Sequence, residues 1–177
     1  MSEAVARSTD LLVRPARQDE LAEVGAMTVA AYEADGLLAA DPEYAHTLSD
    51  AARRAEHAEL LVAVTAEGGL LGSVTVTPPG SAFAEISRAD ELEFRMLSTV
   101  PAARGRGVGE ALTTAVVERA RAVGARRVVM CSLDAMTAAH RLYTRLGFVR
   151  LPDRDWQPVP GLWLRAFGLD LVTSTAG

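Results

Sequence analysis

A glycine- and arginine-rich segment contains the residues whose types and spacing best fit a chemical role. It runs Arg104-Gly105-Arg106-Gly107-Val108-Gly109 and lies between a predicted strand and a predicted helix. Glycine at every second position lets backbone amides face outward and lets a ligand approach closely. The first turn of a helix adds unpaired N–H donors at the positive end of its dipole. With two arginines nearby, these donors predict an anion site suited to a diphosphate.

Two familiar phosphate motifs are excluded at this segment. The P-loop requires a lysine after its second glycine, and the chain contains none. The dinucleotide fingerprint requires G-x-G-x-x-G, whereas the glycines here are two residues apart throughout. An ordinary glycine-rich turn that opens a helix is the alternative interpretation.

Composition restricts the classes of protein that the chain can belong to. It has 177 residues, of which 49% are hydrophobic and 23% charged, and these values predict one globular domain. The pattern along the chain predicts a leader at 1–10, the domain at 11–171 and a tail at 172–177. The net charge of −5 argues against nucleic-acid binding. The single cysteine, Cys131, excludes an intrachain disulfide, and no apolar run reaches the ~20 residues that cross a bilayer. We therefore expect a cytoplasmic protein without a membrane partner.

The periodicity of hydrophobic residues predicts the elements that position this segment. Strands are expected at 11–14, 60–66, 70–77, 91–99, 127–131, 148–151 and 162–169. Helices are expected from a cap at Asp19 to about Gly36, and at 43–59, 108–123 and 136–146. This order predicts a three-layer α/β domain, with a mixed sheet of about seven strands and helices on both faces.

Two motifs in this order are similar to those of the GNAT superfamily of N-acetyltransferases. Arg104-Gly105-Arg106-Gly107-Val108-Gly109 resembles the family's [R/Q]-x-x-G-x-[G/A], and residues 139–148 resemble A-x-x-L-Y-x-x-x-G-F. The resemblance covers residues 11–171. It implies that acetyl-CoA is the co-substrate, that its diphosphate lies on the glycine loop, and that its pantetheine arm lies between two parted strands, here 91–99 and 127–131.

The resemblance also implies individual contacts to the cofactor. The amide of Leu97 would polarise the thioester carbonyl, as an oxyanion-type donor. Met136 stands where many members have an asparagine that binds the CoA arm, so a backbone group or water must replace those hydrogen bonds. The expected cofactor-binding residues are Leu97, Ser98, Thr99, Arg104, Gly105, Arg106, Gly107, Val108, Gly109, Met136 and Ala139.

Tyr143 and Glu93 are the expected catalytic residues. Tyr143 matches the tyrosine that members often use as a general acid toward the departing sulfur, and the alternative is a packed ring on the inner face of its helix. Glu93 lies eleven residues before Arg104, the offset of the general base in the histone-acetylating branch. It is predicted to share a strand face with Glu91, and the alternative is a solvated face paired with Arg95. Other members use water chains without a dedicated base.

Side chains in three loops are expected to bind the acceptor. Residues 32–44, 78–90 and 152–161 supply acids and aromatic rings, which suit a cationic amine. His46 and His57 do not have metal-ligand spacing, so no metal site is predicted. Cys131 is expected to be a core residue rather than a nucleophile.

These observations favour an acetyltransferase that moves acetyl from acetyl-CoA directly to a primary amine, most simply on a small molecule, in a ternary complex. A non-enzymatic acyl-CoA sensor on the same fold is one alternative, and a protein or peptide N-acetyltransferase is another. The acidic balance of the chain argues against charged tRNA as a partner. Homodimers are frequent in the family.

Overall fold

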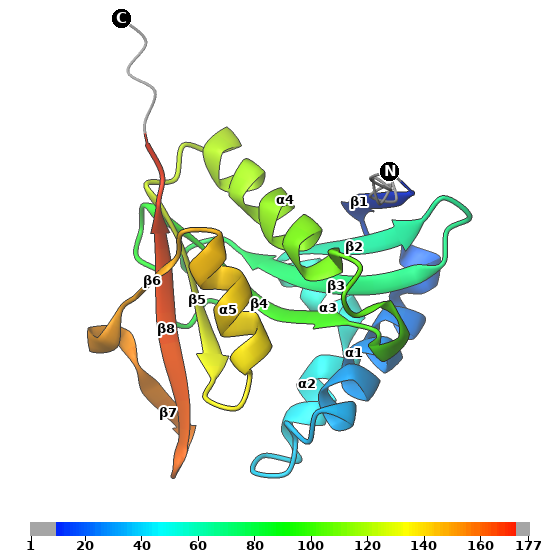
Figure 1. Cartoon of the computed structure of the whole chain (residues 1–177), viewed down its shortest axis with the longest axis horizontal. Helices are drawn as coiled ribbons and strands as arrows, with labels where there is room; N and C mark the ends of the chain where they lie inside the picture. The colour runs from blue at the N-terminus through cyan, green and yellow to red at the C-terminus, as the bar shows by residue number, and fades with distance from the viewer. Residues whose placement is uncertain (1–9, 173–177) are drawn as a thin grey trace, which may run out of the picture.

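A mixed sheet runs through the computed structural model, which describes residues 10–172 (Figure 1). The strands are β1 (Leu11–Pro15), β2 (Glu59–Thr65), β3 (Leu70–Thr77), β4 (Glu91–Thr99), β5 (Arg127–Leu133), β6 (Val149–Arg150), β7 (Trp156–Val159) and β8 (Leu162–Asp170). The helices are α1 (Leu21–Ala34), α2 (Tyr44–Ser49), α3 (Ala51–His57), α4 (Val108–Ala122) and α5 (Thr137–Arg145). The strand order is β1-β2-β3-β4-β5-β8-β6, and β7 pairs with β8 beyond this path.

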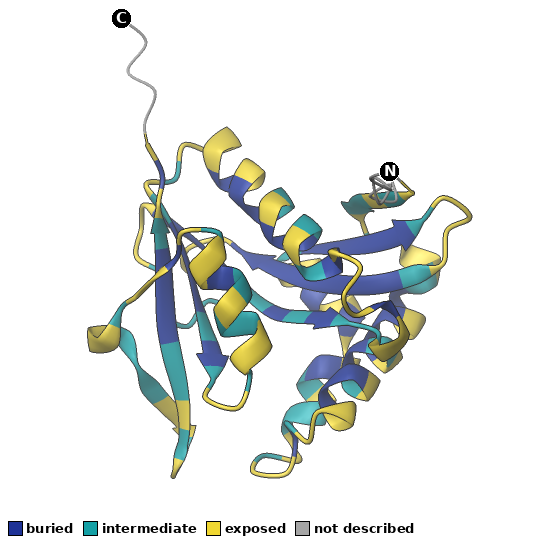
Figure 2. Ribbon diagram, in the orientation of Figure 1, coloured by how far each residue is buried: buried dark blue, intermediate teal, exposed yellow. Residues whose placement is uncertain are grey.

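Helices cover both faces of the sheet, as the sequence predicts. In β2, Leu61 and Ala63 belong to the core beneath α4, whereas Leu60, Val62 and Val64 belong to the core beneath α1 and α3. Side chains of a strand alternate between its faces, so a strand that is apolar throughout must be covered on both sides. Figure 2 shows the result, with buried strands between helices whose outer faces are exposed.

The sheet opens between β4 and β5, the only parallel neighbours among the described strands. They pair solely where residues 91–93 lie opposite residues 127–129. Beyond that point β4 continues along β3 to Thr99, and β5 continues along β8 to Leu133. The carboxyl halves of the two strands therefore leave their facing edges without a strand partner.

A bulge in β4 accompanies this opening. Met96 has a φ of 57°, and the pairing of β3 with β4 shifts register between Ser73 and Thr75. The sequence predicts Met96 on the same face as Leu92 and Phe94, and that prediction is wrong. Leu92 and Phe94 pack beneath α4, whereas Met96 packs with Tyr32 on the opposite face. A bulge inserts one residue and so reverses the alternation that follows it.

The predicted helix at 43–59 is two helices and the start of β2. Asp50 separates α2 from α3 with non-helical dihedral angles, and its side chain accepts a hydrogen bond from the Arg53 amide at 3.0 Å. Aspartate is a good N-cap because its carboxylate satisfies an unpaired donor of the first helical turn. Helical periodicity continues across Asp50, so it conceals the break.

The segment between the last two predicted strands contains β7, whereas the sequence predicts a loop there. Pro158 lies inside it, and the register with β8 shifts between Trp156 and Val159. Proline is tolerated on an edge strand, where its missing N–H costs no ladder hydrogen bond. The strand predicted at 148–151 shortens to Val149–Arg150.

Glu91, predicted to share a strand face with Glu93, is fully buried at the start of β4, so the alternative of a solvated face does not hold for it. Its carboxylate accepts hydrogen bonds from Arg154 at 2.6 and 2.8 Å and from the Arg88 amide at 2.9 Å. Burial by itself would raise the pKa of Glu91, but the hydrogen bonds from Arg154 and the Arg88 amide, together with the charges of Arg154 and Arg127, outweigh it and hold that pKa below its usual value. Glu91 therefore stays ionised and ties β4 to the chain that precedes β7.

No helix within residues 10–172 is long and apolar enough to cross a membrane. The leader predicted at 1–10 and the tail predicted at 172–177 fall outside the described residues, apart from Asp10 and Val172.

Replacement of Glu91 by glutamine is expected to destabilise the fold, because it leaves the Arg154 guanidinium largely buried without a counter-charge. We expect a loss of about 3 kcal/mol in the free energy of unfolding, the lower end for a broken buried pair. The folded-state pKa of Glu91 is depressed, so its contribution is complete above the ordinary glutamate pKa and is lost as pH falls through the folded value. The difference from wild type should shrink accordingly in acid, as measured by urea denaturation at several pH values.

The matched control is Asp90→Asn, which removes a neighbouring carboxylate that pairs with Arg126 at the surface. An exposed ion pair contributes little, so this variant should unfold close to wild type. Equal effects of the two substitutions would contradict a structural role for Glu91.

Candidate active site

The glycine loop and the start of α4 form a set of free main-chain donors. Gly107 is the N-cap of α4, in the left-handed region with a φ of 79°. The amides of Gly107, Val108 and Gly109 have no hydrogen-bond acceptor among the described residues. A Cβ added at Gly105 or Gly107 would enter open space, so the loop presents bare backbone to its surroundings. This is the arrangement expected of an anion site.

A cleft of about 570 Å³ runs from this loop into the opening between β4 and β5. Its lining brings together most of the predicted cofactor residues: Leu97, Ser98, Thr99, Arg104, Gly105, Gly107, Val108, Gly109, Met136 and Ala139. Arg106 is exposed and does not line the cleft. The predicted cofactor-binding residues therefore line one cleft, except for Arg106, which lies outside it.

Arg104 is held at the mouth of the cleft by Asp35, the residue that follows α1. The two side chains form a double hydrogen bond, at 2.6 and 2.9 Å, and both are about half exposed. The pair links α1 to the glycine loop across the sheet opening. The charge of Arg104 is thus partly balanced before any anion binds.

Main-chain groups of β4 face the opening. The amide of Val100 donates to the carbonyl of Leu71 in β3 at 2.9 Å, and Ser98 lies opposite Ser73. Main-chain groups along a strand point alternately to its two edges. The amides of Leu97 and Thr99 therefore point away from β3 and into the cleft.

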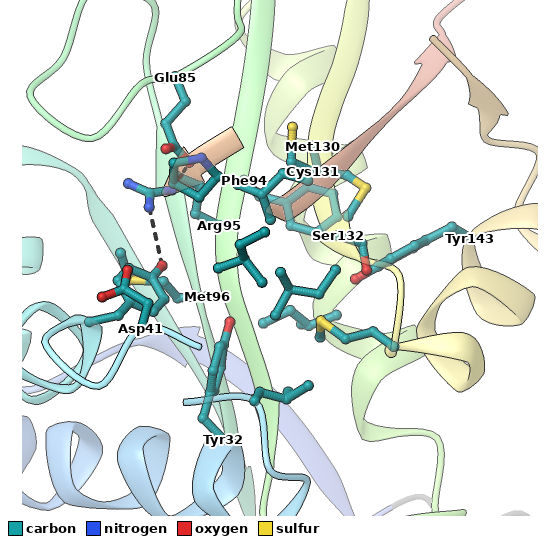
Figure 3. A pocket seen from close by; sticks show the side chains of 18 residues that line it. Tyr32, Asp41, Glu85, Phe94, Arg95, Met96, Met130, Cys131, Ser132 and Tyr143 are labelled. Atoms are coloured by element: carbon teal, nitrogen blue, oxygen red, sulfur yellow. Dashed lines mark hydrogen bonds and ion pairs between the residues drawn. The ribbon is translucent and has the colours of Figure 1, made fainter. Parts of the chain in front are cut away.

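A second cavity, of about 250 Å³, lies on the opposite side of this opening (Figure 3). Its walls are mainly apolar, and its polar groups come mainly from α2 and the segment before it, the loop before β4, and the strands β4 and β5. The polar lining includes Asp41, Tyr44, Glu85, Arg95 and Ser132. The cavity and the cleft share Tyr32, Leu37, Leu97, Met136 and Tyr143, so the two spaces meet at these side chains.

Tyr143 stands at this junction. Its ring is packed against Phe94, Phe148 and Phe167, and only 1% of the residue is exposed. Its hydroxyl has no hydrogen-bond partner among the described residues, and Figure 3 shows it turned toward the cavity. Burial raises the pKa of this phenol above its ordinary value, which keeps it protonated.

Glu93 lies apart from both spaces, and this corrects its expected position. It is fully buried, and its carboxylate accepts hydrogen bonds from the amides of Glu85, Ile86 and Ser87. It lines neither the cleft nor the cavity. The loop at 81–89 covers it, an arrangement that strand alternation alone could not reveal.

Glu85 is the cavity carboxylate that sequence reasoning missed, because that loop has no periodic pattern. It forms an ion pair with Arg95, Oε1 to Nε, at 2.6 Å, and only 17% of its side chain is exposed. Burial raises the pKa of Glu85 to about 7, although Arg95 opposes that rise. Glu85 can therefore exchange a proton near neutral pH.

Cys131 and His140 are poor candidates for chemistry. Cys131 lines the cavity, but burial raises the pKa of its thiol to about 12, so the reactive thiolate is scarce. His140 is not solvated as its helical position predicts; its Nε2 lies 3.0 Å from the Ser132 hydroxyl. Partial burial lowers the pKa of His140 and favours the neutral ring.

Comparison with known proteins decides the family. A profile described as the "Acetyltransferase (GNAT) family" matches residues 26–148. The chain belongs to the GNAT acetyltransferase family. Enzymes of this family draw the acetyl group from acetyl-CoA.

Solved GNAT structures share the fold over nearly the whole chain. A GCN5-related N-acetyltransferase from Kribbella flavida is 25% identical, with a TM-score of 0.65, over 92% of this chain and 98% of that one. A structure from Corynebacterium glutamicum, described as histone acetyltransferase HPA2 and related acetyltransferase, is 24% identical, with a TM-score of 0.71, over 94% and 99%. The yncA protein of Salmonella typhimurium, solved with its cofactor acetyl-CoA, is 18% identical, with a TM-score of 0.65, over 96% and 98%.

One curated relative is similar over a shorter stretch. N-acetylaspartate synthetase of Danio rerio is 35% identical over 78 residues, which are 43% of this chain. The match spans 28% of the length of that relative.

The residues of the cleft fit the cofactor of the GNAT family. Free amides and open space at the glycine loop suit a diphosphate, and the inward amides of Leu97 and Thr99 suit the amide groups of pantetheine. Met136 offers no side-chain hydrogen bond where many members have asparagine, and its own amide is bonded to the Leu133 carbonyl at 3.0 Å. Neighbouring groups or water must make the hydrogen bonds to that part of the pantetheine arm.

The glycine loop can be tested by a matched pair of variants, Gly107→Asp and Gly107→Asn. Both residues tolerate a positive φ and have nearly the same shape, so they differ mainly by one negative charge. At an effective dielectric constant of about 20, a charge some 4 Å from a phosphate costs about 4 kcal/mol, so Gly107→Asp should weaken CoA binding by about 1,000-fold.

Titration calorimetry with CoA measures both variants. Gly107→Asn should retain most of the affinity, since it adds bulk but no charge. If the two variants bind CoA equally well, the loop does not hold the diphosphate.

Proposed function

We propose that the chain transfers an acetyl group from acetyl-CoA directly to the primary amine of a small cationic molecule, within a ternary complex. The observation that supports this most is the junction of the cleft and the cavity at Leu97, Met136 and Tyr143. A donor in the cleft and an acceptor in the cavity can meet there while both are bound. Proximity of this kind converts a bimolecular reaction into an intramolecular one.

Acetyl-CoA supplies the activated acetyl group as a thioester, and the chain's own residues orient it. The amides of Gly107, Val108 and Gly109 would hold the diphosphate, and Thr99 would hold the arm through its main chain. The amide of Leu97 would then donate to the thioester oxygen, where negative charge develops during transfer.

Tyr143 is proposed as the general acid. Its protonated hydroxyl can donate to the sulfur as the thiolate leaves, and no protein acceptor among the described residues competes for that proton. A positioned acid of this kind typically contributes roughly 10²–10⁴ to the rate.

The cavity supports a small cationic acceptor. Its volume of about 250 Å³ suits a small molecule, and Asp41 provides negative charge in a lining that includes the rings of Tyr32 and Tyr44. Glu85 adds a carboxylate that is paired with Arg95. The acceptor that the name of the relative from Danio rerio implies, an aspartate amine, is also a small molecule. Cys131 is too weakly acidic to carry the acetyl group, which favours direct transfer over an acyl-enzyme.

A screen of amines against acetyl-CoA, read by release of free thiol, tests the proposal directly. Release with at least one small primary amine is expected. If the protein binds CoA but no amine in a broad panel releases thiol, it is an acyl-CoA sensor. If thiol is released only with peptides or proteins as acceptors, the protein is a peptide or protein N-acetyltransferase.

Tyr143→Phe is expected to lower kcat about 100-fold, within the range for loss of a general acid, while CoA affinity changes little. Phenylalanine keeps the ring packing against Phe94 and Phe148 and removes only the hydroxyl. Steady-state kinetics and CoA calorimetry on the same preparation separate the two effects. An unchanged kcat would show that Tyr143 contributes only to packing and is not the general acid.

A further inference from the structure

Glu93, which occupies the position expected of a base, instead holds the loop before β4. Its Oε2 accepts the amides of Glu85 at 2.9 Å, Ile86 at 3.2 Å and Ser87 at 3.2 Å. Three consecutive main-chain donors on one buried carboxylate fix the path of the loop. The first of these donors belongs to Glu85, so Glu93 determines where that residue's side chain begins.

From there the Glu85 side chain reaches the wall of the acceptor cavity, where Arg95 meets it. Arg95 forms an ion pair with Glu85, Nε to Oε1, at 2.6 Å, and its two terminal nitrogens donate hydrogen bonds to the Phe83 carbonyl and the Tyr44 hydroxyl, both at 3.1 Å. Because both terminal nitrogens are hydrogen-bonded, the Arg95 guanidinium is held in place beside the Glu85 carboxylate. Figure 3 shows Glu85 and Arg95 together on the side of the cavity away from Tyr143.

We propose that Glu85 accepts the proton of the acceptor ammonium, through ordered water, and that Glu93 is the positioning residue that holds it in the cavity. The proposal rests on the acetyl transfer proposed above and assigns the base of that reaction. It separates two roles that the family resemblance would combine in Glu93.

The proton balance is complete with these two groups and water. One N–H bond of the ammonium breaks, its proton passes to a Glu85 oxygen, and the freed electron pair of nitrogen forms the bond to the acetyl carbon. The C–S bond then breaks, and the sulfur takes a proton from Tyr143. The second amine proton restores Tyr143 through water, and Glu85 returns its proton to solvent.

The surroundings of Glu85 suit this role at neutral pH. Arg95 faces it from β4, Glu93 lies beneath it on the same strand, Tyr44 approaches from α2 and Cys131 from β5. Desolvation and Glu93 favour the protonated form, and Arg95 favours the ionised form. The balance puts the pKa of Glu85 at about 7, where a base can both take and release a proton.

The first test needs no acceptor. Carbon NMR of the full chain with ¹³C-labelled glutamate carboxyls should show a resonance that titrates near pH 7, and Glu85→Gln should remove it. The matched control Glu43→Gln, an exposed acid two residues beyond Asp41, should leave that resonance in place. A Glu85 carboxyl that titrates in the ordinary glutamate range would overturn the proposal.

The second test compares two acceptors, butylamine and methoxyamine, with acetyl-CoA. Butylamine is an ammonium at pH 7 and needs a base, whereas methoxyamine is already neutral. Glu85→Gln should lower kcat/KM for butylamine at pH 7 about 100-fold, as expected for loss of a general base, and recover toward the pKa of the amine. Its effect on methoxyamine should be within a few-fold. Equal losses with both amines would overturn the assignment.

Two further variants separate a chemical role from a structural one. Glu85→Asp keeps a carboxylate and should retain more butylamine activity than Glu85→Gln. Glu93→Gln should shift the pH dependence of kcat/KM for butylamine without abolishing activity. Glu85 is still present in this variant, but its loop is held less firmly. If thiol is released normally with Glu85→Gln, only the assignment of Glu85 fails; if no amine releases thiol from wild type, acetyl transfer itself fails.

Discussion

The short parallel pairing between β4 and β5 is the constraint on which the rest of the structure depends. Three residue pairs join the strands, and then the bulge at Met96 turns β4 away. A sheet normally satisfies its main-chain groups through neighbouring strands. Here the facing edges stay unpaired, and this leaves the amides of Leu97 and Thr99 free for a ligand that lies in the opening as a strand would.

Helices on both faces divide that opening into two spaces that meet at Leu97, Met136 and Tyr143. On one side, α4 and α5 bring the glycine loop, Met136 and Tyr143 to the cleft. On the other, α1, the segment before α2 and the loop before β4 enclose the cavity. The bulge allows consecutive residues Arg95, Met96 and Leu97 to line one cavity, which regular strand alternation would prevent.

The two buried carboxylates of β4 are satisfied by main-chain amides and an arginine. Glu91 is satisfied by Arg154 and the Arg88 amide, and Glu93 by three loop amides. Burial of an ionised carboxylate is costly without such partners. Glu85 has only its ion pair with Arg95 among the described residues, and burial raises its pKa.

The sequence alone determined the features that rest on local pattern. Hydrophobic periodicity predicted α4, α5 and most strands, and glycine spacing predicted the anion loop at the start of α4. Both signals depend only on neighbours in the chain: a repeat of 2 or 3.6 residues, or a glycine where the backbone needs a positive φ. The motif around Tyr143 added the family, and with it the expected cofactor.

Only the tertiary structure decided which carboxylate reaches the acceptor cavity. Strand alternation put Glu91 and Glu93 on one face, but it could not show that Arg154 and the loop at 81–89 cover that face. The side chain of Glu85 reaches the cavity because amides close in sequence fold onto Glu93 while Arg95 approaches from β4. A pKa depends on the burial and charges that such contacts create, and these arise between segments that no local pattern relates.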